Sequence, residues 1–253
     1  MSRLLHLFCM LIIFCAPSLC QADDAAMASS LFEAGNQAYE SEQWPLAISK
    51  YQQALKISQG NHVLYYNLGN AYFKQDQLGQ AIRYYQKALR ITPRSRVIQE
   101  NLELARLRTQ DKVSKPDLGF VLSVFQQMHE AVSPNELVVT ICLLWLATCL
   151  VLALRIYLNQ PLLGPTSALL LGLLLLPGIS LGTKFYQYEV LRQAVIIEKE
   201  TAVYSGPGES YQLTFSLHEG TNILVEQQRK EWSEISVGKN LKGWINSQSL
   251  AGI

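Results

Sequence analysis

The feature that most constrains this 253-residue chain is a block of residues that returns in register 34 positions later. In each copy, small residues would let two helices approach closely, and a tyrosine would fill the space beside them. Pro93 then stops the second helix of the second copy. The pattern predicts stacked pairs of helices. The recurring residues are Gly35 and Gly69, Ala47 and Ala81, Tyr51 and Tyr85, and Ala54 and Ala88.

The second copy resembles the tetratricopeptide repeat (TPR), and the first copy departs from it at Ala38 and Gln59, where Tyr and Pro are usual. The resemblance implies an all-α TPR domain over residues 26–108 that binds other proteins rather than catalysing a reaction. Its helices are expected over 26–40, 45–57, 62–75 and 78–91, with a fifth, capping helix over 95–108. The residues that match are Tyr65, Leu68, Gly69, Tyr72, Ala81, Tyr85, Ala88 and Pro93.

The N-terminus has the pattern of a secretory signal peptide, expected over residues 1–22. An apolar run ends at Leu19, and the small residue Ala22 is followed by two aspartates, so cleavage is expected after Ala22. Cys20 offers the alternative of a lipid attachment site. The large side chain of Leu19, where a small residue is wanted, counts against that alternative.

Two later segments are hydrophobic and carry no charge, over residues 137–154 and 162–183. At a helical rise of ~1.5 Å per residue, each can cross a bilayer core of about 30 Å. With Arg155 reaching toward the interface, the first membrane span is expected over 137–157 and the second over 162–183. A pair of buried core helices is the alternative, but the rest of the chain is too short to surround both. The spans form a hairpin, so both soluble parts are expected outside the cytoplasm.

The linker over residues 109–136 is expected to hold an amphipathic helix over 118–132. We interpret it as a helix that lies on the membrane surface, with an ordinary linker helix as the alternative. Ser133, Pro134 and Glu136 then predict a capping box that opens the first span, with Pro in the first turn and Glu returning to the backbone of Ser133.

Residues 195–253 change to a pattern of short strands separated by glycine-rich or charged turns. Strands are expected over 203–204, 212–217, 222–227, 233–237 and 243–245, which predicts a small all-β barrel. This segment resembles a bacterial SH3-like domain. The residues that carry the resemblance are Val203 through Gly208, Leu217, Glu219, Gly220, Trp232, Gly243, Trp244 and Ile245.

The fold class is therefore multi-domain: an all-α TPR repeat, a transmembrane hairpin of two helices and an SH3-like barrel. That order of parts resembles the BatE family of the Bacteroides aerotolerance operon. The resemblance implies a protein of the bacterial inner membrane with both soluble domains in the periplasm. It also implies an envelope complex with von Willebrand A domain proteins and a MoxR-type ATPase, and a role in aerotolerance or stress.

No residue pattern in the chain indicates catalysis. The four histidines lie in different segments without metal-ligand spacing, and neither a nucleophile elbow nor a phosphate-binding loop is present. A net charge of +1 with scattered basic residues gives no electrostatic drive toward nucleic acid. We expect no enzyme activity, no cofactor and no metal.

A binding surface can be predicted on the first helix of each repeat. Aromatic, asparagine and aromatic residues recur at i, i+4 and i+7, on the expected concave side, where they suit an extended peptide. The alternative is that the rings only fill space between helices. Because the asparagines are expected to point away from the repeat core, their replacement is expected to leave folding nearly unaffected. The candidate partner-binding residues are Phe32, Asn36, Tyr39, Tyr66, Asn67, Asn70 and Phe73.

One kind of TPR partner is disfavoured by the sequence. TPR domains that hold a chaperone's C-terminal carboxylate resemble this chain at Asn36 and Asn67, but Phe32, Val97 and Asn101 stand where those domains carry cations. The favoured function is a scaffold that binds membrane or periplasmic proteins. The alternatives are a module that binds peptidoglycan or senses the envelope, and a TPR assembly factor for cytochrome c maturation.

Overall fold

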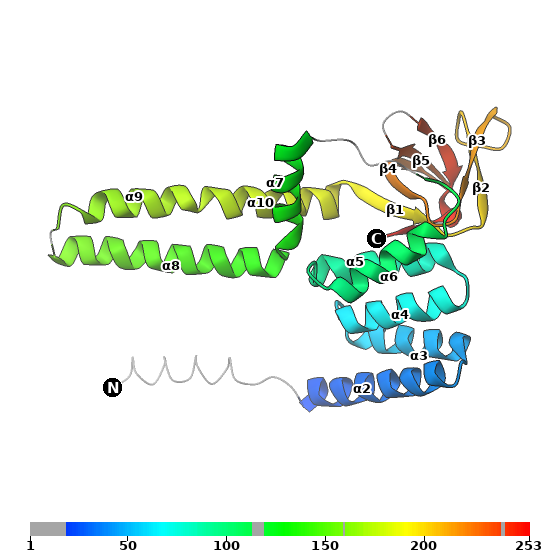
Figure 1. Cartoon of the computed structure of the whole chain (residues 1–253), viewed down its shortest axis with the longest axis horizontal. Helices are drawn as coiled ribbons and strands as arrows, with labels where there is room; N and C mark the ends of the chain where they lie inside the picture. Colours follow the sequence, from blue (N-terminus) through cyan, green and yellow to red (C-terminus); the bar gives the residue numbers. More distant parts are fainter. Residues whose placement is uncertain (1–18, 113–118, 159, 239–240) are drawn as a thin grey trace.

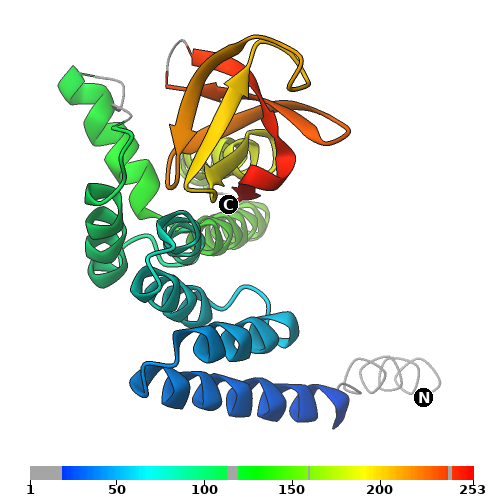
Figure 2. The same cartoon turned by 90° about the vertical axis from the view of Figure 1, so that its right-hand side faces the viewer.

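The structure is a computed structural model that describes residues 19–112, 119–158, 160–238 and 241–253. Figure 1 shows a stack of helices and a β-sheet at one end of a long helical hairpin. In Figure 2 the hairpin is seen end-on, and the sheet covers the part of the stack that is farthest from the N-terminal helix. Of the expected signal peptide, residues 1–18 lie outside the described residues.

The stack contains the helices that the repeat predicts, with bounds close to those expected except at the N-terminus. There the first helix begins at Leu19 rather than at residue 26. Gly35 and Gly69 are the points of closest approach, because a Cβ on either would lie 2.5 Å from the ring of Tyr51 or Tyr85, respectively. The prediction that small residues let paired helices pack closely is confirmed. The helices are α2 (Leu19–Glu40), α3 (Trp44–Ile57), α4 (His62–Lys74), α5 (Leu78–Ile91) and α6 (Arg96–Leu107).

The hairpin consists of two helices that, by length and composition, could cross a membrane; they are the ones found in the described part of the chain. The first is α8 (Pro134–Leu158). The second runs from Leu163 to Val190 and is divided into α9 (Leu163–Leu173), α10 (Leu175–Phe185) and a π-helical turn, η1 (Tyr186–Val190). The division falls where Pro177, which has no N–H, cannot donate to the carbonyl group of residue 173. In the most apolar stretch of each helix only 11% and 6% of the residues are buried, so the described residues leave most of the hairpin surface uncovered.

The predicted capping box at the start of α8 is confirmed. The backbone N–H of Ser133 donates to Oε2 of Glu136 at 2.8 Å, and the N–H of Glu136 donates to Oγ of Ser133 at 3.2 Å. Arg94, just after α5, forms an ion pair with the same carboxylate. The base of the hairpin is thus tied to the helix stack. Before it, α7 (Gly119–Ala131) lies across the hairpin axis (Figures 1 and 2).

Within the described residues the sheet has seven antiparallel strands in the order β3-β2-β6-β5-β4-β1-β7. The first and last members of this order are not paired, so the sheet is open, and the expected closed SH3-like barrel is not confirmed. The flanking strands β1 and β7 were not predicted. The strands are β1 (Arg192–Ile196), β2 (Glu200–Tyr204), β3 (Leu213–His218), β4 (Asn222–Arg229), β5 (Trp232–Val237), β6 (Leu241–Asn246) and β7 (Leu250–Gly252).

The sheet packs directly on α5, and β1 is the strand that joins them. Val195 belongs to the hydrophobic core of the helix stack, whereas Ala194 and Ile196, on the opposite face, belong to the core of the sheet. At the start of α5 a Cβ on Gly79 would collide with the carbonyl oxygen of Ile196. The stack and the sheet therefore share one continuous apolar interface, and α6 is not the sole cover of the last repeat.

Two carboxylates fix this interface from opposite sides. Oε1 of Glu219, in the turn after β3, accepts the backbone N–H of Gly79 at 2.9 Å, and burial raises its pKa. Asp111, after α6, accepts the N–H of His218 at 2.7 Å and the hydroxyl of Thr221 at 2.6 Å. Burial alone would raise the pKa of Asp111, but these hydrogen bonds outweigh burial and lower it.

Gly220 and Gly60 allow the interface to be tested with a matched pair of substitutions. Both have positive φ, +88° and +74°, but a Cβ on Gly220 would meet Thr109 and Ile82 of the stack, whereas Gly60 has open space. We expect Gly60→Ala to cost about 1 kcal/mol of unfolding free energy from backbone strain. Gly220→Ala should cost a further ~1–3 kcal/mol from overpacking. Urea unfolding of the detergent-solubilised protein, followed by circular dichroism, measures both; equal costs would contradict this interface.

Candidate functional site

The expected binding surface contains a hollow of about 390 Å³ between α2 and α4. We call it the groove. It is lined by four of the seven predicted residues, Asn36, Tyr39, Asn67 and Asn70. The buried Tyr51 of α3 also lines it. Its other lining residues were not predicted as site residues. They are Glu33, Gln37 and Glu40.

Asn36 and Asn70 are held by the same hydrogen bond, one repeat apart. The hydroxyl of Tyr51 donates to Oδ1 of Asn36 at 2.8 Å, and the hydroxyl of Tyr85 donates to Oδ1 of Asn70 at 2.8 Å. Each tyrosine is only 1% exposed. A buried hydroxyl without a partner would cost free energy, so each asparagine supplies an acceptor that its repeat needs.

The amides also connect the first helices of successive repeats. Nδ2 of Asn67 donates to Oδ1 of Asn36 at 3.3 Å, and Nδ2 of Asn101, on α6, donates to Oδ1 of Asn70 at 3.1 Å. The expectation that Asn36 and Asn70 point away from the core is therefore wrong, and we now expect their replacement to affect folding. Asn101 could have been recognised, because it follows Asn70 at the interval that separates Asn67 from Asn36.

The asparagines still have donors to offer. Within the described part of the chain, Nδ2 of Asn36 and Nδ2 of Asn70 make no hydrogen bond, although their oxygens each accept two. Both residues line the groove and are half-buried. Each amide is thus fixed in orientation by its oxygen, with its NH₂ group available to a carbonyl oxygen of a ligand.

The aromatic members of the predicted surface pack mainly on their own neighbours. Ring centroids lie 6.0 Å apart for Phe32 and Tyr51, 6.1 Å for Tyr66 and Tyr85, and 4.8 Å for Tyr39 and Trp44. Tyr66 also accepts a hydrogen bond from Asn101, and Phe73 lies under the guanidinium of Arg108. The four predicted rings, those of Phe32, Tyr39, Tyr66 and Phe73, are half-buried. They fill space between helices and remain partly exposed.

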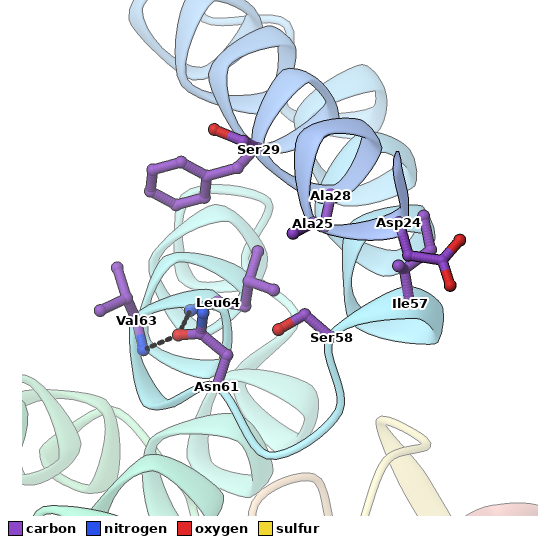
Figure 3. A pocket seen from close by; sticks show the side chains of 10 residues that line it. Asp24, Ala25, Ala28, Ser29, Ile57, Ser58, Asn61, Val63 and Leu64 are labelled. Atoms are coloured by element: carbon purple, nitrogen blue, oxygen red, sulfur yellow. Dashed lines mark hydrogen bonds between the residues drawn. The ribbon is translucent and has the colours of Figure 1, made fainter. Parts of the chain in front are cut away.

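Phe32 lies apart from the groove and lines a second hollow of about 650 Å³, between the N-terminal part of α2 and the start of α4. Figure 3 shows this hollow with Asn61 at its edge. Oδ1 of Asn61 accepts the backbone N–H groups of Val63 and Leu64 at 2.9 and 3.3 Å, so Asn61 serves as the N-cap of α4. The amide oxygen of Asn61 is already used within the protein, so this hollow lacks the oriented amides of the groove, and the groove is the better candidate.

The groove carries negative charge. Glu33 and Glu40 lie on its rim, and no cation is among the described residues that line it. Burial raises the pKa of Tyr51 to about 12, and the two carboxylates add to the increase. Glu33 and Glu40 could have been identified from the sequence, because they lie three residues before and four after Asn36 on one helical face.

Comparison with known protein families supports the assignment of TPR repeats. A family model described as tetratricopeptide repeat matches residues 62–95, and one described as TPR repeat matches residues 35–76. The chain therefore contains TPR repeats, which makes this part of it a protein-interaction module. Among curated proteins, none matches the sequence.

Two solved TPR structures are similar to the chain. The Sgt2 TPR domain from Aspergillus fumigatus is 23% identical, with a TM-score of 0.31 over 43% of this chain and 62% of that one. The Arabidopsis OM64 TPR domain is 18% identical, with a TM-score of 0.32 over 58% of this chain and 96% of that one. This chain thus spans less than two thirds of the Sgt2 domain.

The Asn36–Tyr51 pair gives a prediction about folding. Asn36→Ala should lower the free energy of unfolding by ~1–3 kcal/mol, because the Tyr51 hydroxyl stays buried without its acceptor. Once Tyr51→Phe has removed that hydroxyl, the same asparagine substitution should cost clearly less. Urea unfolding of wild type, both single variants and the double variant measures the coupling. Additive costs would show that the hydrogen bond contributes nothing.

Proposed function

We propose that this protein is a membrane-anchored scaffold whose TPR groove holds an extended segment of a partner protein. The hairpin would cross the bacterial inner membrane, and the helix stack and the sheet would both lie in the periplasm. Support comes from the two exposed apolar helices and from the position of both soluble parts at the same end of the hairpin (Figure 1). The expected signal peptide gives the orientation.

The observation that carries the proposal is the pair of oriented amides in the groove. An extended peptide presents carbonyl oxygens along its backbone, and the NH₂ groups of Asn36 and Asn70 are available to bind them. Glu33 and Glu40 favour a segment with lysine or arginine side chains, because none of the described residues that line the groove is a cation. A C-terminal carboxylate would be repelled by the same rim.

The sequence resemblance supplies the context of the proposal. In the BatE-like order of parts, the partners would be von Willebrand A domain proteins and a MoxR-type ATPase in an envelope complex related to aerotolerance or stress. The sheet would then be the SH3-like member of that order. Peptidoglycan binding by the sheet and a role in cytochrome c maturation are the alternatives, and capture experiments separate them by what is recovered with the protein.

The groove can be tested by removing its charge. Glu33→Gln with Glu40→Gln should weaken partner capture roughly two- to thirtyfold at low salt, if each exposed pair contributes ~0.2–1 kcal/mol. The matched control is Glu200→Gln with Glu209→Gln, which removes two exposed carboxylates from β2 and from the loop between β2 and β3. The measurement is the yield of membrane proteins that co-purify with the full chain in mild detergent.

The outcomes distinguish the candidate sites. A partner that is lost only from the groove variant, and whose capture weakens as salt rises, supports the proposal. An equal yield from both variants would exclude the groove as the binding site. Recovery of wall fragments in place of proteins would favour the peptidoglycan alternative.

The membrane topology gives a separate prediction. Reporter fusions after Gln110 and after Ile253 should both be active with an enzyme that works only in the periplasm. The chain crosses the membrane twice between these positions and therefore returns to the same side. A fusion within the short loop at Gln160 serves as the control and should be active only with a cytoplasmic reporter. Cytoplasmic activity at either of the first two positions would contradict the topology.

A further inference from the structure

A cavity of about 700 Å³ lies where the helix stack, α7, the end of the second apolar helix and the end of the sheet meet. It is separate from the groove. Its wall gathers four cations from different elements: Arg90 of α5, Arg94 after it, Arg106 of α6 and Lys184 of α10. The carboxylates on the same wall are Glu103 and Glu130, so positive charge is in excess.

Among the described residues, two of these four cations have an acidic partner and two have none. Arg94 pairs with Glu136, and Nη1 of Arg106 lies 4.0 Å from Oε2 of Glu103. In the part of the chain that the structure describes, no Asp or Glu oxygen lies within 4.0 Å of Arg90 or Lys184, and Nη1 of Arg90 donates to the main-chain oxygen of Ile253 at 2.6 Å. Burial lowers the pKa of Arg90 and of Arg106, since their charges are partly removed from water. An anion in the cavity would relieve this cost.

The wall also contains an acceptor without a donor. Oε1 of Gln86 is buried and has no hydrogen-bond partner among the described residues, although Nε2 of the same side chain donates to Asn222. A buried oxygen of this kind favours a ligand that carries a hydroxyl or ammonium group beside its negative charge. The cavity therefore calls for an anion and a hydrogen-bond donor in one molecule.

The position of the cavity indicates where such a molecule comes from. Gln127 and Glu130 of α7 and Lys184 of α10 line it, at the base of the hairpin. Figures 1 and 2 show α7 perpendicular to the hairpin axis, and Phe120 and Phe125 on it are 83% and 66% exposed. In a membrane crossed by the hairpin, a helix with this orientation lies at the level of the lipid headgroups.

We propose that this cavity binds the phosphate ester headgroup of an anionic lipid. The phosphate would lie between Arg90, Arg106 and Lys184, and a headgroup hydroxyl would donate to Gln86. Basic pockets at the ends of membrane helices suit this chemistry, because the headgroup stays at the interface while its acyl chains follow the hairpin. The inference rests on the membrane placement that is part of the proposed function.

The test uses the full chain in phosphatidylcholine nanodiscs with and without phosphatidylglycerol, and native mass spectrometry of the lipid that stays bound. Arg90→Gln with Lys184→Gln should lower the preference for phosphatidylglycerol about twenty-five-fold, at about fivefold for each cation. The matched control, Arg96→Gln with Lys56→Gln, removes the same two charges from exposed positions. It should keep the preference of the wild type.

A further variant protects the test against loss of folding. Arg90 also holds the main-chain oxygen of Ile253 at 2.6 Å, so its replacement could loosen the sheet. The ammonium group of Lys184 makes no hydrogen bond among the described residues, so its loss should not disturb the fold. Lys184→Gln alone should lower the preference for phosphatidylglycerol about fivefold. Unchanged preference in both cavity variants would overturn the proposal.

The remaining outcomes separate the proposals from each other. A chain that inserts into phosphatidylcholine but shows no preference for phosphatidylglycerol overturns the headgroup site and leaves the scaffold proposal standing. A chain that does not insert overturns the membrane placement and both proposals with it. Glycerol phosphate added in solution tests the source of the phosphate. If it binds as well as the lipid does, the ligand is a soluble phosphate ester, and the lipid assignment is overturned.

Discussion

The arrangement of the whole molecule depends on the burial of β1 on both faces. Val195 packs into the helix stack while Ala194 and Ile196 pack into the sheet. Because β1 follows η1 almost directly, this strand also sets the distance between the hairpin and the stack. The cation-lined cavity and the interface glycines exist only because these parts meet at one strand. A polar residue at Val195 would remove the contact that brings them together.

The sequence predicts those features that depend on local patterns. Gly35 and Gly69 identify the helix pairs, and Ser133 with Glu136 identifies the start of α8, because spacing alone determines both. It does not predict β1, since a strand buried on both faces lacks the alternation of apolar and polar residues by which strands are recognised. The open edge of the sheet and the convergence of Arg90 with Lys184 depend on contacts between distant segments, which no local pattern records.

The groove was predicted in part, and the reason is physical. Asparagine spacing identifies the face of the helices that forms the groove. It does not show that the same asparagines also accept hydrogen bonds from the buried tyrosines of the repeats. One carboxamide offers both an acceptor and a donor, so the oxygen of Asn36 can stabilise Tyr51 while its nitrogen makes no hydrogen bond to any described residue. In this fold, a side chain that recognises a partner is also one that the fold requires. Loss of binding after its replacement must be separated from loss of structure.

The contact between Glu219 and Gly79 has a consequence for how the chain acquires its structure. Gln77, at the N-cap of α5, makes no side-chain hydrogen bond to its own helix, so the first turn has an amide that the repeat does not satisfy. A carboxylate from the sheet, 140 residues later in the chain, satisfies it. The last helix of the second repeat is thus completed by a segment that is synthesised after the hairpin. The stack and the sheet should therefore unfold in one cooperative transition, although their sequences have the character of separate modules.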